Sequence, residues 1–492
     1  IRLASSVLEM DLSPSRAVPL NARVAPSALQ TMGAFTGAGL SSSAAGASSL
    51  NWADIASMGD SVRKTQSYGF PKPKTMSQFK QLGGSLSYHC RLGLRLLNSG
   101  SHRTKGIAVE MLEIVFWTLV VLVGYVYFGY PALLLLLSRG AHKEPVHDET
   151  RQPHVTLLIS AFNEADCIAE KLDNSLELDY PKELLEIVVI SDASDDGTDE
   201  IVGGYAGRGV RLLRMEDRGG KTLGLNAGVE EASGEIIVFS DANAMYREDA
   251  IRALVGPFSD DSIGAVIGEQ AYHASENDAG KSESLYWRYE TAIKELESRN
   301  GSVVGGDGAI YAARKDLYKP MRADALSDFI NPLQVVRSGH RVIYNRRALA
   351  YEATAESFEK EYHRKVRIVN RAWRATWSMA ELLNPFRHGT FAIKLWSHKM
   401  LRWLVPFFLL LLFATNAYLL DEGWIYNLAF WSQILFYVMA LVGGIRQGEK
   451  NLPKVLSVPY YFCLVNVASA QGIFEAFVGQ TYTTWSTARA SD

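Results

Sequence analysis

The sequence predicts an α/β domain with a mostly parallel sheet, joined to transmembrane helices. Between residues 150 and 355, short apolar runs such as "HVTLLIS" and "EIIVFSD" alternate with helical patterns such as "TLGLNAGVEEA". Buried strands that alternate with helices are typical of parallel sheets covered on both faces. Outside this block, nearly uncharged segments have the length of membrane helices. We therefore expect a globular domain at a membrane.

The candidate membrane segments are residues 114–137, 403–420, 424–442 and 455–477. Each is close to the roughly 20 residues that span a bilayer as a helix. Gln471 lies in the fourth segment, so a re-entrant or interfacial position is an alternative there. Lys and Arg follow the first and third segments, whereas acidic residues separate the second from the third. The positive-inside rule then predicts a multi-pass protein of the cell (inner) membrane with its large polar block in the cytoplasm.

Residues 1–110 fit neither pattern, because they are rich in Ser, Ala and Gly and show no clear period. Three interpretations are open: a disordered extension, an organelle presequence, or translated sequence upstream of a start at Met111, which we favour. The formal charge of −3 gives no reason to expect a nucleic-acid partner. Three cysteines without metal or disulfide spacing fit a reducing compartment.

Polar side chains follow the predicted strands where each strand ends. Asn163 and Glu164 follow the first strand, Asp192 follows the second, and Asp241 and Asn243 follow the fourth. Ligands of such sheets collect at the carboxyl ends of strands. A carboxylate at the end of a buried strand needs a partner, which a divalent cation or a nucleotide would supply.

The turn Asp241–Ala242–Asn243 predicts a metal site. Carboxylate and amide oxygens are ligands that Mg and Mn accept, with water or phosphate in the remaining positions. A metal there would neutralise a diphosphate leaving group. Lys221 follows Gly219 and Gly220 at a helix start, where it adds positive charge near phosphates. The sequence has no P-loop pattern.

The motifs "LLISAFNE", "EIVVISDASDDGTDEI", "RGGKTLGLNAG" and "EIIVFSDAN" resemble those of membrane-embedded family 2 glycosyltransferases. That family includes the synthases of cellulose, hyaluronan, chitin-type oligosaccharides and poly-N-acetylglucosamine. The resemblance covers residues 111–485. It implies a GT-A fold and an inverting transfer from a nucleotide sugar, commonly a UDP-sugar, with Mg or Mn.

The resemblance also implies roles for the residues at the strand ends. Glu164 and Asp192 match positions that contact the nucleoside, and Lys221 matches a position near the base and phosphates. Asp241 and Asn243 match the metal-binding DxD motif. Asp241 is also expected to contact the donor nucleotide. The motif reads DAN here, and the amide lowers the charge of the ligand set.

The segments that follow are expected to bind the acceptor and supply the base. "VVGGDGAIYAARKDL" contains Gly306 and Asp307 in a small-residue run that lets the backbone approach an acceptor sugar. "ALSDFINPLQVVRSGHRVIYN" resembles the family segment that carries the TED motif, with Ser327 and Asp328 in place of Glu-Asp. This resemblance makes Asp328 our candidate general base, which takes a proton from the acceptor hydroxyl. A helix N-cap is the alternative role for Asp328, and Asp324 is the second choice as base.

"YHRKVRIVNRAWRATW" lies where relatives carry a QxxRW motif, although the Gln is missing. Arg371 is expected to bind a diphosphate, and Trp373 to stack on a sugar. A basic amphipathic helix on the membrane surface is the alternative. Residues 356–400 are accordingly expected to form interfacial helices, residues 401–480 two or three transmembrane helices, and residues 481–492 a tail.

The function expected from these observations is sugar transfer from a nucleotide sugar to a growing polysaccharide or oligosaccharide. Transfer of one sugar to a polyprenyl-linked or other lipid acceptor is an alternative. A catalytically silent, nucleotide-sugar-binding subunit with partners in envelope assembly is a third hypothesis. The missing Gln and the DAN turn are the reason to keep that third hypothesis, which ranks below polymer extension.

Overall fold

The computed structural model describes residues 106–138, 148, 150–272, 278–352, 357–448 and 452–484. The expectations for residues 1–105 and 485–492 lie outside the described residues. Residues 106–110 belong to the first long helix, Gly106–Leu137, which therefore begins before the boundary expected at Met111. The added segment contains no proline, so nothing interrupts the helical hydrogen bonds there.

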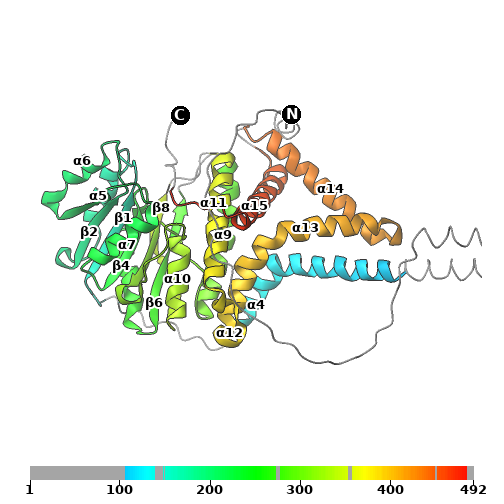
Figure 1. Cartoon of the computed structure of the whole chain (residues 1–492), viewed down its shortest axis with the longest axis horizontal. Coiled ribbons are helices and arrows are strands. Elements are labelled where there is room, and N and C mark those ends of the chain that lie inside the picture. The colour runs from blue at the N-terminus through cyan, green and yellow to red at the C-terminus, as the bar shows by residue number, and fades with distance from the viewer. Residues whose placement is uncertain are drawn as a thin grey trace, which may run out of the picture. The chain divides into compact units, whose positions relative to one another are not determined.

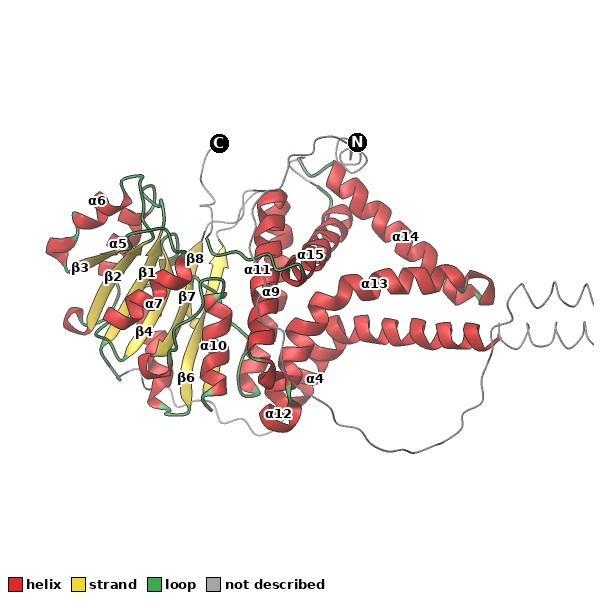
Figure 2. Cartoon of the chain, viewed as in Figure 1, coloured by secondary structure: helices red, strands yellow, loops and turns green. Residues whose placement is uncertain are grey.

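An eight-stranded sheet forms the core of the globular domain, in the order β3-β2-β1-β4-β7-β6-β8-β5 (Figure 2). The strands are β1 (Val155–Ala161), β2 (Leu185–Ser191), β3 (Val210–Arg214), β4 (Ile236–Asp241), β5 (Met245–Tyr246), β6 (Ile263–Tyr272), β7 (Ile310–Arg314) and β8 (Arg341–Glu352). The first four strands are parallel, as the sequence predicts.

The second half of the sheet is mixed rather than mostly parallel. Strand β7 is antiparallel to both β4 and β6, and β5 is antiparallel to β8. The pairing of Ser240 with Ile310 shows why: β7 begins beside the end of β4. A strand that enters at the carboxyl edge of the sheet must run in the opposite direction.

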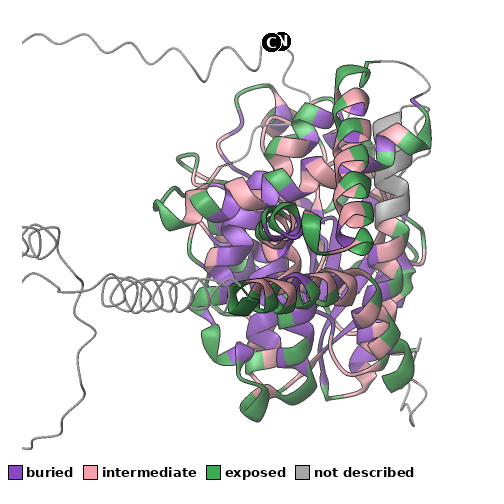
Figure 3. Ribbon diagram, turned by 90° about the vertical axis from the view of Figure 1, so that its right-hand side faces the viewer, coloured by how far each residue is buried: buried purple, intermediate pink, exposed green. Residues whose placement is uncertain are grey.

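Helices cover both faces of the sheet and give it two apolar layers (Figure 3). Leu157 and Leu158 are neighbours on β1 but belong to different clusters, because successive strand residues point to opposite faces. The covering helices are α5 (Ile168–Leu176), α6 (Thr198–Gly203), α7 (Lys221–Glu231), α8 (Ala250–Val255), α9 (Asp278–Arg299) and α10 (Ser327–Arg337). Helix α7 packs so closely that a Cβ on Gly228 would lie 2.5 Å from Ile190 Cδ1.

The remaining chain forms long helices beside this domain (Figure 1). They are α11 (Phe358–Ser378), α12 (Pro385–Lys394), α13 (Leu401–Tyr418), α14 (Trp424–Ile445) and α15 (Lys454–Phe477). Two π-helical turns, η2 (Tyr125–Gly129) and η8 (Leu395–Met400), interrupt the first long helix and the path into α13; α4 (Tyr130–Leu137) follows η2. The first helix runs beside α13, where Phe116 packs with Leu419 and Tyr426.

Three of these helices are long and apolar enough to cross a membrane: Gly106–Leu137, Pro385–Tyr418 and Trp424–Ile445. Their outward side chains are apolar, as in Phe128 (78% exposed) and Ile445 (76% exposed). Such surfaces are unusual on water-soluble monomers. Helix α15 is not among the three. It packs instead along α11, where a Cβ on Gly472 would lie 2.6 Å from the Val366 carbonyl oxygen.

Candidate functional site

A cavity of about 910 Å³ lies between the carboxyl edge of the sheet, α11 and the membrane helices. We call it the central cavity. Six of the residues singled out from the sequence line it: Lys221, Asp241, Gly306, Asp307, Asp328 and Arg371. Toward the membrane helices its walls are mainly apolar, with Tyr127, Phe128, Phe436, Val458, Phe462 and Val465. The cavity therefore joins a charged region to an apolar one.

Three charged groups converge beside Gly308. The ammonium group of Lys221 donates to Asp241 Oδ1. A Cβ built on Gly308 would lie 3.0 Å from Lys221 Nζ, 3.4 Å from Asp241 Oδ2 and 3.7 Å from Asp328 Oδ2. The absent side chain of Gly308 thus leaves a small hollow surrounded by one cation and two carboxylates. Residues from three separate segments meet at this point.

The structure separates the two candidate bases. Asp328 lies in the first turn of α10, whose N-cap position is Leu326, so the carboxylate does not cap the helix. Burial raises the pKa of Asp328, Lys221 opposes that rise, and Asp307 and Asp241 add to it. Asp324 does not line the central cavity; its carboxylate pairs with Arg322 at 3.0 Å and Arg374 at 2.8 Å. Asp328 is therefore the better placed carboxylate.

Arg371 reaches the central cavity but is already engaged by the protein. Its Nη2 donates to Thr222 Oγ1 at 3.1 Å and to the Ala325 carbonyl oxygen. Burial lowers the pKa of Arg371 to about 10, against the attraction of Asp328. These contacts fix the position of the loop before α10. The contact of Arg371 with a diphosphate stays a prediction.

Trp373 is not brought into the central cavity. Its own ring is buried and packs against the rings of Trp377, Trp403 and Phe477, at centroid distances of 5.9, 6.4 and 5.9 Å. Trp403 lines the central cavity and Trp373 does not. Trp373 lies two positions after Arg371, and residues so spaced on a helix point in different directions. The expected stacking of Trp373 on a sugar therefore has no support in this arrangement.

The glycine-rich run reaches the cavity as expected. The amide of Gly306 donates to the Asp328 carbonyl oxygen at 2.8 Å, which joins this run to the first turn of α10. The carboxylate of Asp307 is buried and pairs with Lys294 on α9. Asp307 thus has a cationic partner inside the cavity wall.

Glu164, Asp192 and Asn243 lie at neighbouring strand ends but outside the lining of the central cavity. Asp192 is 2% exposed, and its Oδ1 accepts from the amides of Gly219 at 2.8 Å and Gly220 at 3.0 Å. Asp192 therefore fixes the turn before Lys221, and its contact with a nucleoside stays a prediction. Glu164 accepts from Cys167 Sγ at 3.2 Å.

The loops at these strand ends have unusual backbone conformations. Asn163 has φ 52° and Ala193 has φ 58°, both in the left-handed region that non-glycine residues rarely adopt. The side chains of Asn163 and Asp195 bridge the two loops at 2.8 Å. Strained residues of this kind concentrate at functional sites, because surrounding contacts are needed to hold them.

The turn at the end of β4 suits a hard cation, since Asp241 contributes a carboxylate and Asn243 an amide oxygen. Asp241 faces the hollow beside Gly308, where its charge is shared with Lys221. Within the described part of the chain, no group of three His, Cys, Asp or Glu side chains forms a closed metal site. An open site, completed by the ligand's phosphates, fits these residues better.

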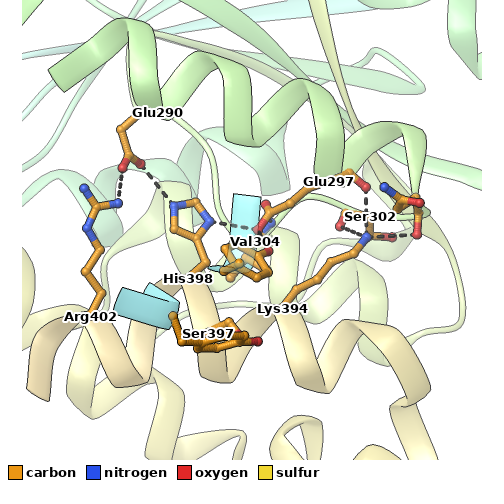
Figure 4. A network of polar contacts seen from close by, with 11 residues as sticks. Glu290, Glu297, Ser302, Val304, Lys394, Ser397, His398 and Arg402 are labelled. Carbon is orange, nitrogen blue, oxygen red and sulfur yellow. Dashed lines mark hydrogen bonds and ion pairs between the residues drawn. The ribbon is translucent and has the colours of Figure 1, made fainter. Parts of the chain in front are cut away.

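A buried polar network forms part of the cavity wall near the membrane helices (Figure 4). His398 Nδ1 faces Glu297 Oε1 at 2.8 Å, and Nε2 faces Glu290 Oε2 at 3.1 Å. A ring with a carboxylate at each nitrogen donates both bonds only as imidazolium. Arg402 also donates to Glu290, while Lys394 Nζ donates to carbonyl oxygens at the end of α9, that of Glu297 at 2.8 Å.

Glu352 lines the central cavity and was not singled out from the sequence. It ends β8, just as Asp241 ends β4. The signal used for Asp192 and Asp241, a carboxylate at the end of a predicted strand, could have found Glu352 had a strand been predicted over β8.

Comparisons with known proteins agree with this geometry. Residues 156–319 match the family model of glycosyl transferase family 2. The poly-beta-1,6-N-acetyl-D-glucosamine synthase of Staphylococcus epidermidis is 26% identical over 212 residues, which are 42% of this chain and 49% of that protein. The synthase of Staphylococcus aureus (strain MSSA476) is 27% identical over 192 residues, 38% of this chain and 45% of that protein. The matches thus cover about half of each relative.

A solved structure is similar in fold. It is the mannosyltransferase PcManGT from Pyrobaculum calidifontis in complex with GDP-Man and Mn²⁺, with a TM-score of 0.57 and 21% sequence identity. The similarity covers 74% of this chain and 99% of that chain. It extends beyond the region matched by the family model, and so it supports the GT-A fold expected from the sequence.

Proposed function

Because the chain carries a family 2 glycosyltransferase domain, we propose that it transfers a sugar from a nucleotide-sugar donor to a growing saccharide, with inversion at the anomeric carbon. The observation that carries this proposal is the convergence of Lys221, Asp241 and Asp328 beside Gly308. A cation and two carboxylates in one cavity suit a reaction in which a diphosphate leaves and a hydroxyl attacks.

Each of these residues has a part in the proposed reaction. Asp328 accepts the proton of the acceptor hydroxyl while that oxygen bonds to the anomeric carbon. The bond from that carbon to the diphosphate oxygen breaks, and the nucleoside diphosphate leaves. Lys221 offsets the charge that develops on it. When bound by Asp241 and Asn243, Mg or Mn would supply further positive charge at the diphosphate.

We infer that the donor is a UDP-sugar and that the protein lies in the cell membrane with this domain in the cytoplasm. Three apolar helices and the charges that flank them support that location. The bilayer is then a partner of the exposed apolar helix faces. Partners in envelope assembly are part of the same proposal.

A lipid-linked acceptor is a second candidate, favoured by the apolar part of the central cavity. Another cavity, of about 260 Å³, shares Phe436 and Phe462 with it and continues between the membrane helices. Hydroxyl-rich sugars lose hydrogen bonds with water in such surroundings, whereas a hydrocarbon chain gains by leaving water. This candidate assigns the apolar walls to the tail of a polyprenyl-type acceptor.

One experiment tests the proposal and separates the acceptors. The purified full-length chain is incubated with Mg or Mn and a panel of UDP- and GDP-sugars, with oligosaccharides or a polyprenyl phosphate as acceptors. We expect nucleotide release from one donor and a fall of about 100-fold or more in the Asp328→Asn variant. A ladder of water-soluble products indicates polymer extension, and one organic-soluble product indicates lipid transfer. Absence of release with every donor would contradict the enzyme and favour a silent binding subunit.

A further inference from the structure

Two π-helical turns line the central cavity from different membrane helices. The turn η2 contributes Tyr127 and Phe128, and the turn η8 contributes His398 and Lys399. Turns of this kind are rare inside helices and are frequently found at functional sites. Their meeting at one cavity indicates that this wall has a role besides packing.

Lys399 is a charged residue within the apolar helix Pro385–Tyr418 and has no partner in the protein. Within the described residues its ammonium group makes no hydrogen bond or ion pair, although it lines the central cavity. Glu290 and Glu297 attract it from farther away, but both carboxylates already contact the His398 ring. Ionisable side chains inside membrane helices almost always have a partner or mark the path of a substrate or an ion. The cavity therefore offers a cation whose counter-charge the described protein does not supply.

The wall that carries Lys399 continues to the proposed base. Trp403, one helical turn after Lys399, also lines the cavity, and its ring packs against Phe329 with the two centroids 6.1 Å apart. Phe329 follows Asp328 in the first turn of α10. Lys399 thus belongs to the wall that joins the proposed base to the membrane helices.

The cavity becomes apolar on the side of the membrane helices. Phe436 and Phe462 line it there, and they also line the cavity of about 260 Å³ between those helices. A ligand that suits all of these surroundings has a hydroxyl for Asp328, an anionic group for Lys399 and an apolar tail. A saccharide joined to a polyprenyl chain through phosphate has these three parts in that order.

We propose that Lys399 binds the phosphate of a lipid-linked saccharide acceptor, while the hydrocarbon chain extends past Phe436 and Phe462. This inference rests on the function proposed above and names the acceptor class of its lipid-linked candidate. Lysine binds phosphate as a point charge, and the attraction is stronger in a poorly solvated cavity than in water. The acceptor hydroxyl bonds to the anomeric carbon and gives its proton to Asp328, and the bond from that carbon to the diphosphate breaks.

The test measures ligand binding to the purified full-length chain in nanodiscs, without donor or metal, by isothermal titration calorimetry against empty nanodiscs. Three probes separate the parts of the ligand. Farnesyl diphosphate carries tail and phosphates, farnesol carries the tail alone, and inorganic pyrophosphate carries the phosphates alone. In the Lys399→Gln variant we expect the dissociation constant of farnesyl diphosphate to rise by about tenfold or more, as for the loss of a charged hydrogen bond. Binding of farnesol, and of pyrophosphate at Lys221, should be unchanged.

Two further variants make the test specific. Lys399→Arg keeps the positive charge and should bind farnesyl diphosphate like the unmodified chain. Lys454→Gln is the matched control, because Lys454 begins α15, is exposed and does not line the central cavity. Melting curves show whether each variant is folded, and Lys399→Met replaces Lys399→Gln if the latter is not.

Unchanged binding of farnesyl diphosphate in a folded, uncharged Lys399 variant overturns the inference. Equal loss of farnesol or pyrophosphate binding overturns it too, as does a failure of the unmodified chain to bind farnesyl diphosphate. If the unmodified chain releases nucleotide while farnesyl diphosphate binds independently of Lys399, this inference fails and the proposed function stands. If binding depends on Lys399 but no donor releases nucleotide, the phosphate site stands and the proposed function fails.

Discussion

The hydroxyl of Thr222 donates to the carbonyl oxygen of Ala325 at 2.8 Å. Thr222 follows Lys221 at the start of α7, and Ala325 lies just before the turn that carries Asp328. Arg371 donates to both members of this pair. One buried set of hydrogen bonds therefore holds the segments of Lys221, which is proposed to offset the charge of the diphosphate, and of Asp328, which is the proposed base.

Thr222→Val should slow sugar transfer by about tenfold or more, because small displacements of reacting groups are costly. Unfolding should become easier by only about 1 kcal/mol, the usual net value of one hydrogen bond. The control is Thr376→Val: Thr376 is also buried and donates to a carbonyl oxygen at 2.8 Å, but within α11. Nucleotide release and thermal melting measure the two effects. Equal loss of activity in both variants would contradict the special role of Thr222.

Gly308→Ala should abolish most activity while leaving the fold intact. The added Cβ would fill the hollow among Lys221, Asp241 and Asp328, at distances of 3.0 to 3.7 Å from their charged atoms. Gly308 has no positive φ, so alanine introduces no backbone strain there. Gly203→Ala on α6 is the control, since its Cβ meets nothing within 4 Å. Full activity of Gly308→Ala would show that the reacting atoms lie elsewhere.

The pH dependence of sugar transfer should report the environment of Asp328. A base must be ionised, so activity falls as the pH drops through its pKa, which burial places above the ordinary value of about 3.9. Asp307 contributes to this rise in pKa. Asp307→Asn should therefore move the acid limb of the kcat/KM profile to lower pH, whatever it does to the maximal rate.

The control for this shift is Asp173→Asn, because Asp173 is exposed and pairs with Arg208 far from the cavity. It should leave the acid limb in place. An acid limb that stays fixed, or moves to higher pH, in Asp307→Asn would indicate that a different group limits the reaction.

Most of the fold could be predicted from the sequence because its signals are local. A short apolar run such as that of β4 is typical of a strand in a sheet covered on both faces. A long apolar run such as that of α14 is typical of a helix that spans a membrane. The direction of β7 could not be predicted, because it depends on where α9 and the glycine-rich run return the chain.

The site could be predicted only in part, for the same reason. Asp241 was singled out as a carboxylate at the end of a predicted strand, and Asp328 by the resemblance of its segment to a family motif. Which of Asp328 and Asp324 faces the cavity depends on tertiary structure, and so does the packing of Trp373 away from it, which helical spacing does not reveal. Glu352 was missed because no strand was predicted over β8, the strand that it ends.

His398→Gln should strongly destabilise the protein. The side chains of His398 and Glu297 are 1% and 0% exposed, and the His398 ring contacts the buried carboxylates of both Glu290 and Glu297. Removing one partner of such a cluster costs about 3–5 kcal/mol. Thermal melting in detergent or nanodiscs measures the loss. Arg208→Ala, which breaks the exposed pair with Asp173, should cost less than about 1 kcal/mol. If His398→Gln melts at the same temperature as Arg208→Ala, the contacts of His398 with the two buried carboxylates do not stabilise the protein as expected.

The same network has a consequence for how the protein can be divided. Lys394 donates to carbonyl oxygens at and just after the end of α9, and His398 contacts two acidic side chains of α9, yet both residues belong to the helix Pro385–Tyr418, which is apolar enough to cross a membrane. A fragment cut after the sheet would lose the Lys394, His398 and Arg402 partners of these groups and would keep only local ones, such as the Val304 amide on Glu297 Oε2. Catalytic and membrane parts are thus a single unit of folding, and a soluble excised enzyme would have to be re-engineered along the whole length of α9.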